Sequence, residues 1–394
     1  MDATLTTTGS AAARGRWALA VVFLVNGFLT GSWAPQIPVF VARLGISEFT
    51  LGLLILLFGL GAVGAMSVTG YLISRFGSRD VTRGLSVVAS FTLLFVSVAP
   101  NVPLAAVAMV LFGGLIGGMD VAMNANAVVV ERKLSRAIMS SSHGFWSLGG
   151  FIGGGLGGLF IQQFGPVLHG VAVTIVAIAA VVFAIGRLVG EERPEKHEHK
   201  SFSLPRNPAI YLIGMMALFS MVPEGAVLDW AALYLRQEMG ADIATAGFAF
   251  AAFSGIMAIM RFLGDGVRNR FGSVRTLRLS ALVAAIGIFA ASIATTPWMA
   301  IAAFAFAGFG VANIVPILFS AAGNQTGLSS GAGMSVVTTM GYSGILVAPS
   351  AIGFVAQRTG FSIVFMTVSC LLLVVCVMAG LAHRAEFASG TPKE

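Results

Sequence analysis

The chain has 394 residues, of which 57% are hydrophobic and 10% are charged, and its formal net charge is +7. A water-soluble domain carries charge on about a quarter of its residues, so this composition excludes a soluble globular protein. Apolar stretches of about 20 residues, the length that crosses a ~30 Å hydrocarbon core, cover almost the whole sequence and predict an integral membrane protein.

Twelve such stretches follow one another, and each is expected to be a helix because backbone groups in lipid must be hydrogen-bonded within their own segment. The first stretch is too long for a signal peptide and has no small-residue cleavage site at its end. We place the spans at 16–41, 50–73, 81–99, 103–131, 137–163, 167–190, 208–235, 243–264, 276–295, 298–322, 331–357 and 361–383.

The two halves of the sequence repeat each other, since Arg75-Phe76-Gly77-Ser78 recurs as Arg270-Phe271-Gly272-Ser273, 195 positions later. Each half contains six spans, so both halves enter the membrane in the same orientation, related by an axis along the membrane normal. The predicted fold is all-α, with twelve transmembrane helices in two pseudo-symmetric bundles and a central cavity between them. The expected bundles are residues 1–190 and 208–394, and residues 191–207 form a cytoplasmic linker.

The positive net charge is explained by membrane topology. With the N-terminus in the cytoplasm, all but three of the 23 lysines and arginines fall on cytoplasmic segments, the exceptions being Arg43, Arg236 and Arg358. This positive-inside pattern predicts that both termini are cytoplasmic. The basic excess therefore indicates no nucleic-acid partner. We expect membrane lipid and a small-molecule substrate as partners, and a functional monomer.

Neither an enzyme nor a cofactor is indicated. Cys370 and Cys376 lie too far apart along one helix for a disulfide and are interpreted as apolar filler. His197 and His199 lie in the linker, where no further metal ligands converge, so a solvated loop is favoured over a metal site. The sequence also lacks a nucleotide-binding loop or a nucleophile–base pair.

The loop after the second span carries a motif, Gly70-Tyr-Leu-Ile-Ser-Arg75-Phe-Gly-Ser-Arg79. It resembles the signature loop of the major facilitator superfamily, G-x-L-x-D-R-x-G-R-R/K, except that Ser74 replaces the usual acid. In the second half the acid stands at Asp265. The resemblance covers the full length and implies a carrier that works by alternating access.

This resemblance also implies a cytoplasmic gate, in which arginines pair with carboxylates and helix C-termini when the inner side is shut. The alternative is that these arginines are ordinary positive-inside anchors. The expected gate residues are Arg75, Arg79, Glu131, Arg136, Arg261, Asp265 and Arg270.

Three further segments, Trp33-Ala-Pro35, Asp120-Val-Ala-Met-Asn124 and Glu224-Gly-x-x-x-Asp-Trp230, resemble one bacterial branch of inner-membrane carriers. This branch includes the rhizopine-locus membrane transport protein and is distantly similar to fucose–proton symporters. The branch resemblance implies a bacterial inner-membrane location and movement of a small polar solute coupled to protons.

Three acids, Asp120, Glu224 and Asp229, lie well inside the predicted spans. An ionised group at the centre of a membrane helix costs roughly 2.5–3.5 kcal/mol on insertion scales, so each needs a reason to be there. Arg261 is expected near the cytoplasmic end of its span, which leaves these acids without a cationic partner. Such a carboxyl group can load and release a proton, and we assign proton coupling to Asp120 and Glu224.

Alternative readings remain for these acids. Asp120 and Asn124 share one helix face and could simply hold helices together. Glu224 stands between Pro223 and Gly225, which predicts an interrupted helix beside a carboxylate. Asp229 lies five residues on, so the two acids cannot both face the cavity squarely, and one of them could instead shape an outer gate with Trp230.

The remaining polar residues of the spans favour a sugar or polyol, because amides supply hydrogen bonds and aromatic rings stack on C–H faces. Interfacial anchoring is the alternative for the tryptophans. His143 is interpreted as a packing residue more readily than as a proton relay. The expected substrate-binding residues are Asn26, Thr30, Trp33, Gln36, Asn124, Asp229, Trp230 and Asn313.

The direction of transport rests on one position. The superfamily's antiporter motif has proline where this chain has Gly154, so symport is favoured. Two alternatives stay open: a proton-driven exporter of drugs or metabolites, and a membrane receptor that binds a ligand without transporting it.

Overall fold

The computed structural model describes residues 2–134, 138–190, 207–325 and 330–385, and these residues are helical throughout, apart from short connections. The helices are α1 (Asp2–Trp33), α2 (Gln36–Leu44), α3 (Glu48–Phe76), α4 (Ser78–Ala89), α5 (Thr92–Val98), α6 (Val102–Leu134), α7 (Met139–Phe164), α8 (Pro166–Ile185), α9 (Pro208–Met239), α10 (Ile243–Phe271), α11 (Ser273–Ser292), α12 (Pro297–Gly323), α13 (Ser330–Thr359), α14 (Phe361–Met378) and the 3-10 helix η1 (Ala379–Ala385).

Within the described residues, twelve segments are long and apolar enough to cross a membrane, which confirms the predicted fold class. Two of the predicted spans are broken. The first ends at Trp33, and α2 begins after Pro35, where the backbone turns before it resumes a helical course. The third consists of α4 and α5, separated at Ser90 and Phe91.

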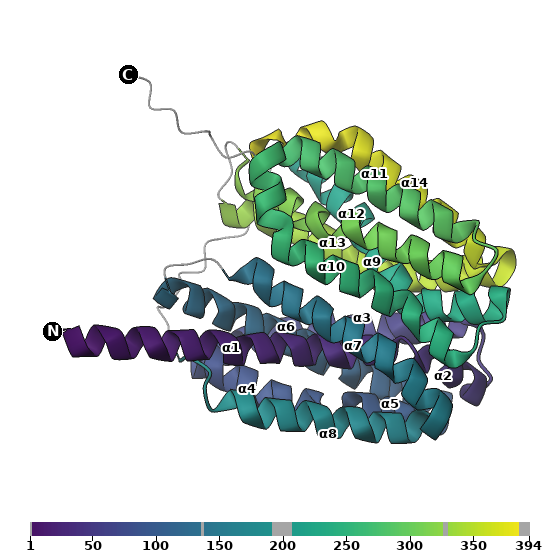
Figure 1. The fold of residues 1–394 in the computed structure, drawn as a ribbon, viewed down its shortest axis with the longest axis horizontal. Coiled ribbons are helices and arrows are strands. Elements are labelled where there is room, and N and C mark those ends of the chain that lie inside the picture. The colour runs from purple at the N-terminus through teal and green to yellow at the C-terminus, as the bar shows by residue number, and fades with distance from the viewer. Residues whose placement is uncertain (1, 135–137, 191–206, 326–329, 386–394) are drawn as a thin grey trace.

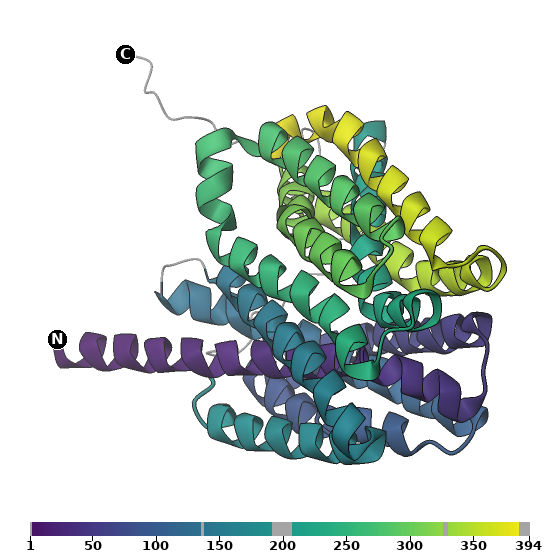
Figure 2. The same cartoon turned by 45° about the vertical axis from the view of Figure 1, so that its right-hand side comes forward.

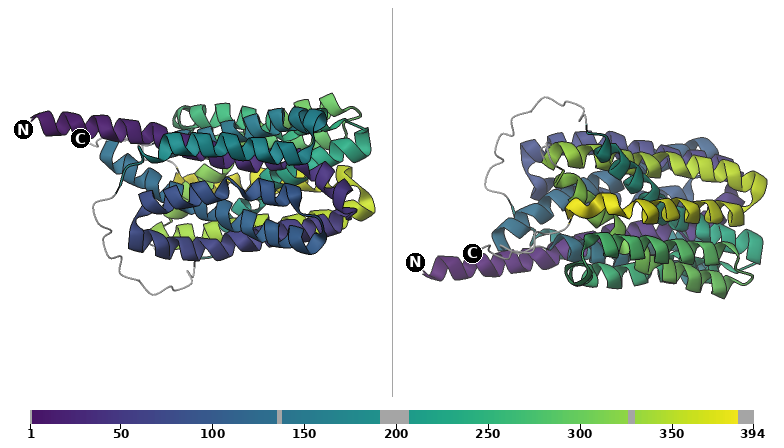
Figure 3. Two further views of the ribbon diagram at one scale, coloured as in Figure 1. Left: turned by 90° about the horizontal axis from the view of Figure 1, so that it is seen from below. Right: turned by 90° about the horizontal axis from the view of Figure 1, so that it is seen from above.

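The helices form two bundles, α1–α8 and α9–η1, which lie side by side in Figures 1 and 2 and one in front of the other in the views of Figure 3. The start of α1 and the end of η1 lie at the same end of the molecule, which we call the terminal face (Figure 1). The other end is called the opposite face. Large apolar side chains are exposed on the outside of both bundles, Val377 by 81% and Phe183 by 64%, as expected of helices that contact lipid.

The internal repeat appears as one local geometry found twice. Gly77 joins α3 to α4 with φ 82°, and Gly272 joins α10 to α11 with φ 78°. Both have ψ near 160°, a combination that is open essentially to glycine alone. The two copies of the Arg-Phe-Gly-Ser sequence therefore make the same tight turn between consecutive helices.

The two bundles meet mainly along two helix pairs, α7 with α10 and α3 with α13, and α2 also contacts α9. Small residues allow the close approach: a Cβ atom at Gly158 would lie 2.8 Å from the backbone oxygen of Ile243, and one at Gly52 would lie 2.7 Å from that of Pro349. The dense contact of the α7–α10 pair fixes the side chains that face the bundle interface.

The bundles are closed on each other at the opposite face. Gln237 on α9 donates to the Glu48 carboxylate on α3 at 2.8 Å, and the backbone N–H of Ala244 donates to Gln162 at 3.0 Å. Toward the terminal face, Gly64 and Gly70 of α3 have no described atom within 4 Å of a Cβ position.

Candidate functional site

Asp120 and Asn124 lie on one face of α6, as their spacing predicts, and Asn124 Nδ2 donates to the Asp120 carboxylate at 3.1 Å. The other end of the same amide, Oδ1, lies 3.2 Å from Nε2 of His143 on α7. With Nε2 protonated, the histidine donates to the amide oxygen. The result is a continuous hydrogen-bonded chain from a carboxyl group to an imidazole, in which all three side chains are half-buried.

Glu224 on α9 has a cationic partner. Arg261 Nη2 lies 3.4 Å from both carboxylate oxygens, and the side chains are only 16% (Arg261) and 24% (Glu224) exposed. The other terminal nitrogen of Arg261 donates to Ser147 Oγ on α7 at 2.5 Å. The guanidinium group thus joins a carboxylate of the second bundle to a hydroxyl group of the first.

This pair corrects the expectation that Glu224 is unpaired and that Arg261 belongs to the cytoplasmic gate. The predicted span ends at residue 264, whereas α10 continues to Phe271. The additional turns add about 10 Å of helix on the terminal side. Arg261 is therefore well inside the bundle, where it reaches Glu224.

A second set of contacts holds the aromatic neighbour of Arg261 in place. The guanidinium carbon lies 5.8 Å from the ring centre of Trp146 on α7, within the range of a cation–π contact. Trp146 Nε1 donates to Asn26 Oδ1 at 2.9 Å, and Asn26 Nδ2 donates to the Ile116 carbonyl at 3.2 Å. Asn26 is 1% exposed, so in this conformation its amide is engaged by Trp146 and α6.

Tyr342 on α13 lies within electrostatic range of both Asp120 and Glu224. It is half-buried and comes from the second bundle, whereas Asp120 belongs to the first. The two carboxyl groups selected from the sequence therefore lie around one shared region between the bundles. Tyr342, Trp146 and Ser147 are missed by the sequence reasoning, because only a known helix arrangement relates them to the acids.

The helix around Glu224 is continuous. Pro223 lies inside α9, which runs unbroken from Pro208 to Met239, so the predicted interruption is wrong. Proline removes only its own N–H from the hydrogen-bond ladder, and the packed neighbouring helices keep the rest of α9 in place.

Asp229 lies apart from Glu224, nearer the opposite face, and is 8% exposed. The Trp33 indole of α1 lies near its carboxyl group, so the two bundles approach each other again here. Trp230 is fully buried and packs against Phe361 at 5.7 Å between ring centres. Asp229 and Trp33 thus form an inter-bundle contact, whereas Trp230 is a core residue of the second bundle.

Three other expected binding residues are buried in helix contacts. Gln36 Nε2 lies 2.9 Å from both the Pro166 carbonyl and His169 Nδ1, inside the first bundle. Thr30 donates to the Asn26 carbonyl one turn earlier. Asn313 is 8% exposed and lies against Gly264. Asn313 therefore lies against α10 one turn from Arg261, whereas Gln36 and Thr30 are engaged within the first bundle.

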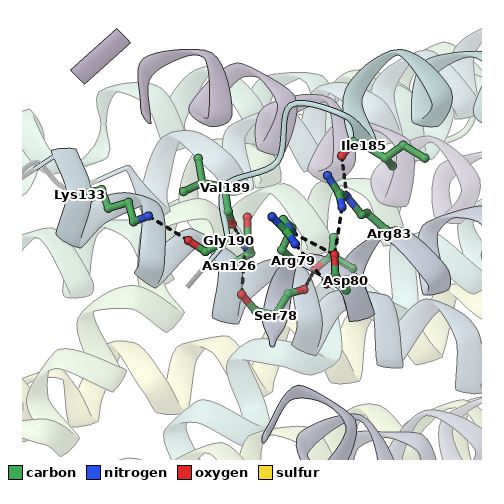
Figure 4. Close-up of polar contacts among 10 residues, drawn as sticks. Ser78, Arg79, Asp80, Arg83, Asn126, Lys133, Ile185, Val189 and Gly190 are labelled. Atoms are coloured by element: carbon green, nitrogen blue, oxygen red, sulfur yellow. Dashed lines mark hydrogen bonds and ion pairs between the residues drawn. The ribbon is translucent and has the colours of Figure 1, made fainter. Parts of the chain in front are cut away.

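The gate residues near the first loop make contacts within their own bundle. Arg79 pairs with Asp80 at 2.9 Å, and Arg83 binds the same carboxylate at 3.0 Å (Figure 4). Arg75 donates to the Tyr71 hydroxyl group one turn earlier. The sequence reasoning misses Asp80, although its three-residue spacing from Arg83 on a helix is a usable signal.

Of the other expected gate residues, the structure describes the side chains of Glu131 and Arg270. Glu131 accepts from the backbone N–H groups of Ile138 and Met139 at 2.7 and 2.9 Å, so it caps the start of α7. Arg270 lies over the ring of Phe271. Arg136 and the side chain of Asp265 lie outside the described residues. None of these described contacts joins the two bundles, in keeping with a structure closed at the opposite face.

Comparisons with known proteins identify the family. A family model described as Major Facilitator Superfamily matches residues 19–263 and 210–394. The chain is 36% identical over 365 residues to an uncharacterised MFS-type transporter of Yersinia pestis, covering 92% of this chain and 94% of the relative.

It is also 30% identical to the membrane protein MosC of Rhizobium meliloti, covering 87% of this chain and 84% of MosC. This relative confirms the resemblance to the bacterial branch predicted from the sequence.

Solved structures show the same fold at low identity. The Escherichia coli xylose transporter XylE in an inward-open conformation gives a TM-score of 0.72 at 13% identity, covering 93% of this chain and 95% of XylE. The nucleoside transporter NupG gives 0.70 at 11% identity, covering 93% and 98%. The TM-scores over more than nine-tenths of the chain establish that the helices are arranged as in these transporters.

Proposed function

The chain belongs to the Major Facilitator Superfamily, and we propose that it moves a small polar solute across the bacterial inner membrane by proton-coupled symport. The matched relatives with printed functions are transporters, which gives the general class. The solute and its coupling to protons form the proposal. No cofactor is needed, since the proton serves as coupling ion.

The observation that carries the proposal is the position of Arg261 between the bundles. Its guanidinium contacts Glu224 in one bundle and Ser147 in the other. Alternating access requires the bundles to rock against each other, so a group bound to both is placed to respond to that motion. A change in the charge of Glu224 changes the strength with which Arg261 is held on the second bundle.

The coupling step follows from this arrangement. A proton that binds Glu224 removes the negative charge facing Arg261, and the guanidinium then needs another acceptor. Polar groups of a bound solute can supply it. Loading of the proton and of the solute therefore favour each other, which is the requirement for symport.

Asp120 is the second proposed proton site. Its chain through Asn124 to His143 gives a route for rearranging hydrogen bonds toward the terminal end of α7. This chain belongs entirely to the first bundle. Each bundle thus contributes one carboxyl group, and Tyr342 lies near both.

The groups around Arg261 suit a neutral polyhydroxylated solute. Trp146 offers a flat apolar surface held rigid by Asn26, and Arg261, Asn124 and Tyr342 offer hydrogen-bonding groups. Stacking together with convergent hydrogen bonds is the usual recognition of sugars and polyols. We therefore propose a sugar, a polyol or a derivative as substrate.

The orientation of the protein in the membrane follows from the distribution of its basic residues. The terminal face carries most of the lysines and arginines, so we propose that it is cytoplasmic.

The test uses the purified full chain in proteoliposomes with an imposed pH gradient, screened against sugars, polyols, amino acids and dyes. Symport predicts uptake of one class together with alkalinisation of the outside medium. Uptake driven by an opposite proton flow would instead identify an exporter. Saturable binding without uptake or exchange would identify a receptor.

A further inference from the structure

A groove of about 260 Å³ lies between α1, α7 and α8, away from the region around Arg261. These three helices contact one another, and α8 runs along the outside of the first bundle (Figure 1). The groove is lined mainly by apolar side chains, including Trp17, Leu24, Phe145 and Phe183. Trp17 is 59% exposed and Phe183 is 64% exposed, so the groove faces the lipid side of the bundle.

Two arginines line the terminal end of this groove. Arg14 lies near the start of the first membrane span, and Arg187 follows the end of α8 at Ile185. The Arg187 guanidinium lies 4.4 Å from the ring centre of Phe183, which holds the charge at the groove wall. No residue that lines the groove is acidic, so its charged end is purely positive.

The length of the groove matches one leaflet of a bilayer. Arg14 and Leu24 lie on the same unbroken helix and both line the groove. Ten residues of helix rise about 15 Å. One leaflet occupies half of a ~30 Å hydrocarbon core, also about 15 Å. Positive charge at the membrane surface and an apolar wall one leaflet deep match the two parts of a phospholipid.

We propose that this groove binds one anionic diacyl phospholipid of the cytoplasmic leaflet. Its phosphate lies between Arg14 and Arg187, and one acyl chain lies along the wall that includes Leu24. Guanidinium groups bind phosphate through charge-assisted hydrogen bonds, and basic pockets between helices on the cytoplasmic side recognise anionic headgroups. Trp17 lies at the headgroup level, where indole rings are favoured.

The groove wall also touches the bundle interface. Phe145 packs edge-to-face on Trp17 at 6.0 Å and on Phe262 of α10 at 5.5 Å between ring centres. A lipid seated against Phe145 therefore supports the contact between α7 and α10. Bound lipid is expected to raise the Tm of the protein, because it binds the folded bundles and not the separated helices.

The test is native mass spectrometry of the full chain in detergent, titrated with phosphatidylglycerol or phosphatidylcholine of identical acyl chains. Wild type is expected to retain phosphatidylglycerol preferentially, with a matching rise in Tm. Arg14→Gln with Arg187→Gln should weaken that retention at least tenfold. Arg275→Gln with Arg278→Gln is the matched control, since these are two exposed arginines on α11, and it should bind like wild type.

A second variant tests the apolar part. Val21→Trp fills the groove and leaves both arginines, so it should also lose phosphatidylglycerol. Three results would overturn the proposal: equal retention of phosphatidylcholine, unchanged binding in the double arginine variant, and displacement of the lipid by inorganic phosphate alone.

Discussion

Arg261 and Glu224 form an ion pair with an N–O distance of 3.4 Å, and their side chains are 16% and 24% exposed. The contact is long for a charge-assisted pair, and both carboxylate oxygens share one guanidinium nitrogen. A pair of this kind is held by its surroundings more than by ideal geometry. It is therefore suited to being broken and re-formed during a transport cycle.

Removal of one partner of the ion pair should cost more than removal of both. Arg261→Gln leaves a half-buried carboxylate without its cation, and a loss of about 1–3 kcal/mol in unfolding free energy is expected after allowance for partial exposure. The double variant Arg261→Gln with Glu224→Gln should recover part of this loss. Thermal unfolding of the wild type, the two single variants and the double variant in detergent gives the coupling free energy between Arg261 and Glu224 as a double-mutant cycle. If the stability losses of the two single variants add up in the double variant, the ion pair contributes nothing to stability.

Trp146 is predicted to depend on Asn26 for its orientation. Trp146→Phe removes the indole N–H and leaves the buried Asn26 oxygen without its donor, which should cost about 1 kcal/mol. Asn26→Ala should weaken solute affinity to a similar degree as Trp146→Phe, although Asn26 is buried away from the solute. Affinity from counterflow assays checks this. An unchanged affinity in Asn26→Ala would show that the indole needs no positioning.

Glu131 should behave as a helix cap in this structure. Glu131→Gln weakens its two hydrogen bonds to the start of α7 and also removes a negative charge from a helix N-terminus. We expect a loss of about 1 kcal/mol in stability, with accumulation of solute kept within twofold of wild type. A strong transport defect at unchanged Tm would restore the gate role expected from the sequence.

Trp33 and Asp229 are expected to hold the opposite face closed. Trp33→Phe keeps the aromatic packing with Phe40 and Phe112 and removes the indole N–H that lies near the Asp229 carboxyl group. A cysteine placed at Ala226, one turn from Asp229 and buried, should then react several-fold faster with a membrane-impermeant thiol reagent added from outside. Equal rates of thiol modification with and without Trp33→Phe would show that Trp33 and Asp229 do not hold the opposite face closed.

The fold could be predicted from the sequence because its determinants are local. Span length, the repeated Arg-Phe-Gly-Ser turn and the distribution of arginines each require only neighbouring residues to interpret. The break at Pro35 and the discontinuity between α4 and α5 were missed, since apolar composition continues across both.

The site was less accessible to prediction because it depends on helix ends and on which faces meet. Asp120 and Asn124 were found through their four-residue spacing, and Glu224 through its cost in lipid. The partner of Glu224 was missed because α10 extends to Phe271, beyond its apolar stretch. Asn26 has the composition of a binding residue, but its amide is used in packing.

The most direct test of proton coupling through Glu224 compares accumulation with exchange in proteoliposomes, for whichever solute the screen identifies. Glu224→Gln mimics the protonated carboxyl group, so it should keep solute exchange at equal concentrations and lose at least tenfold of the accumulation driven by a pH gradient. Accumulation at the wild-type level in Glu224→Gln would contradict the account.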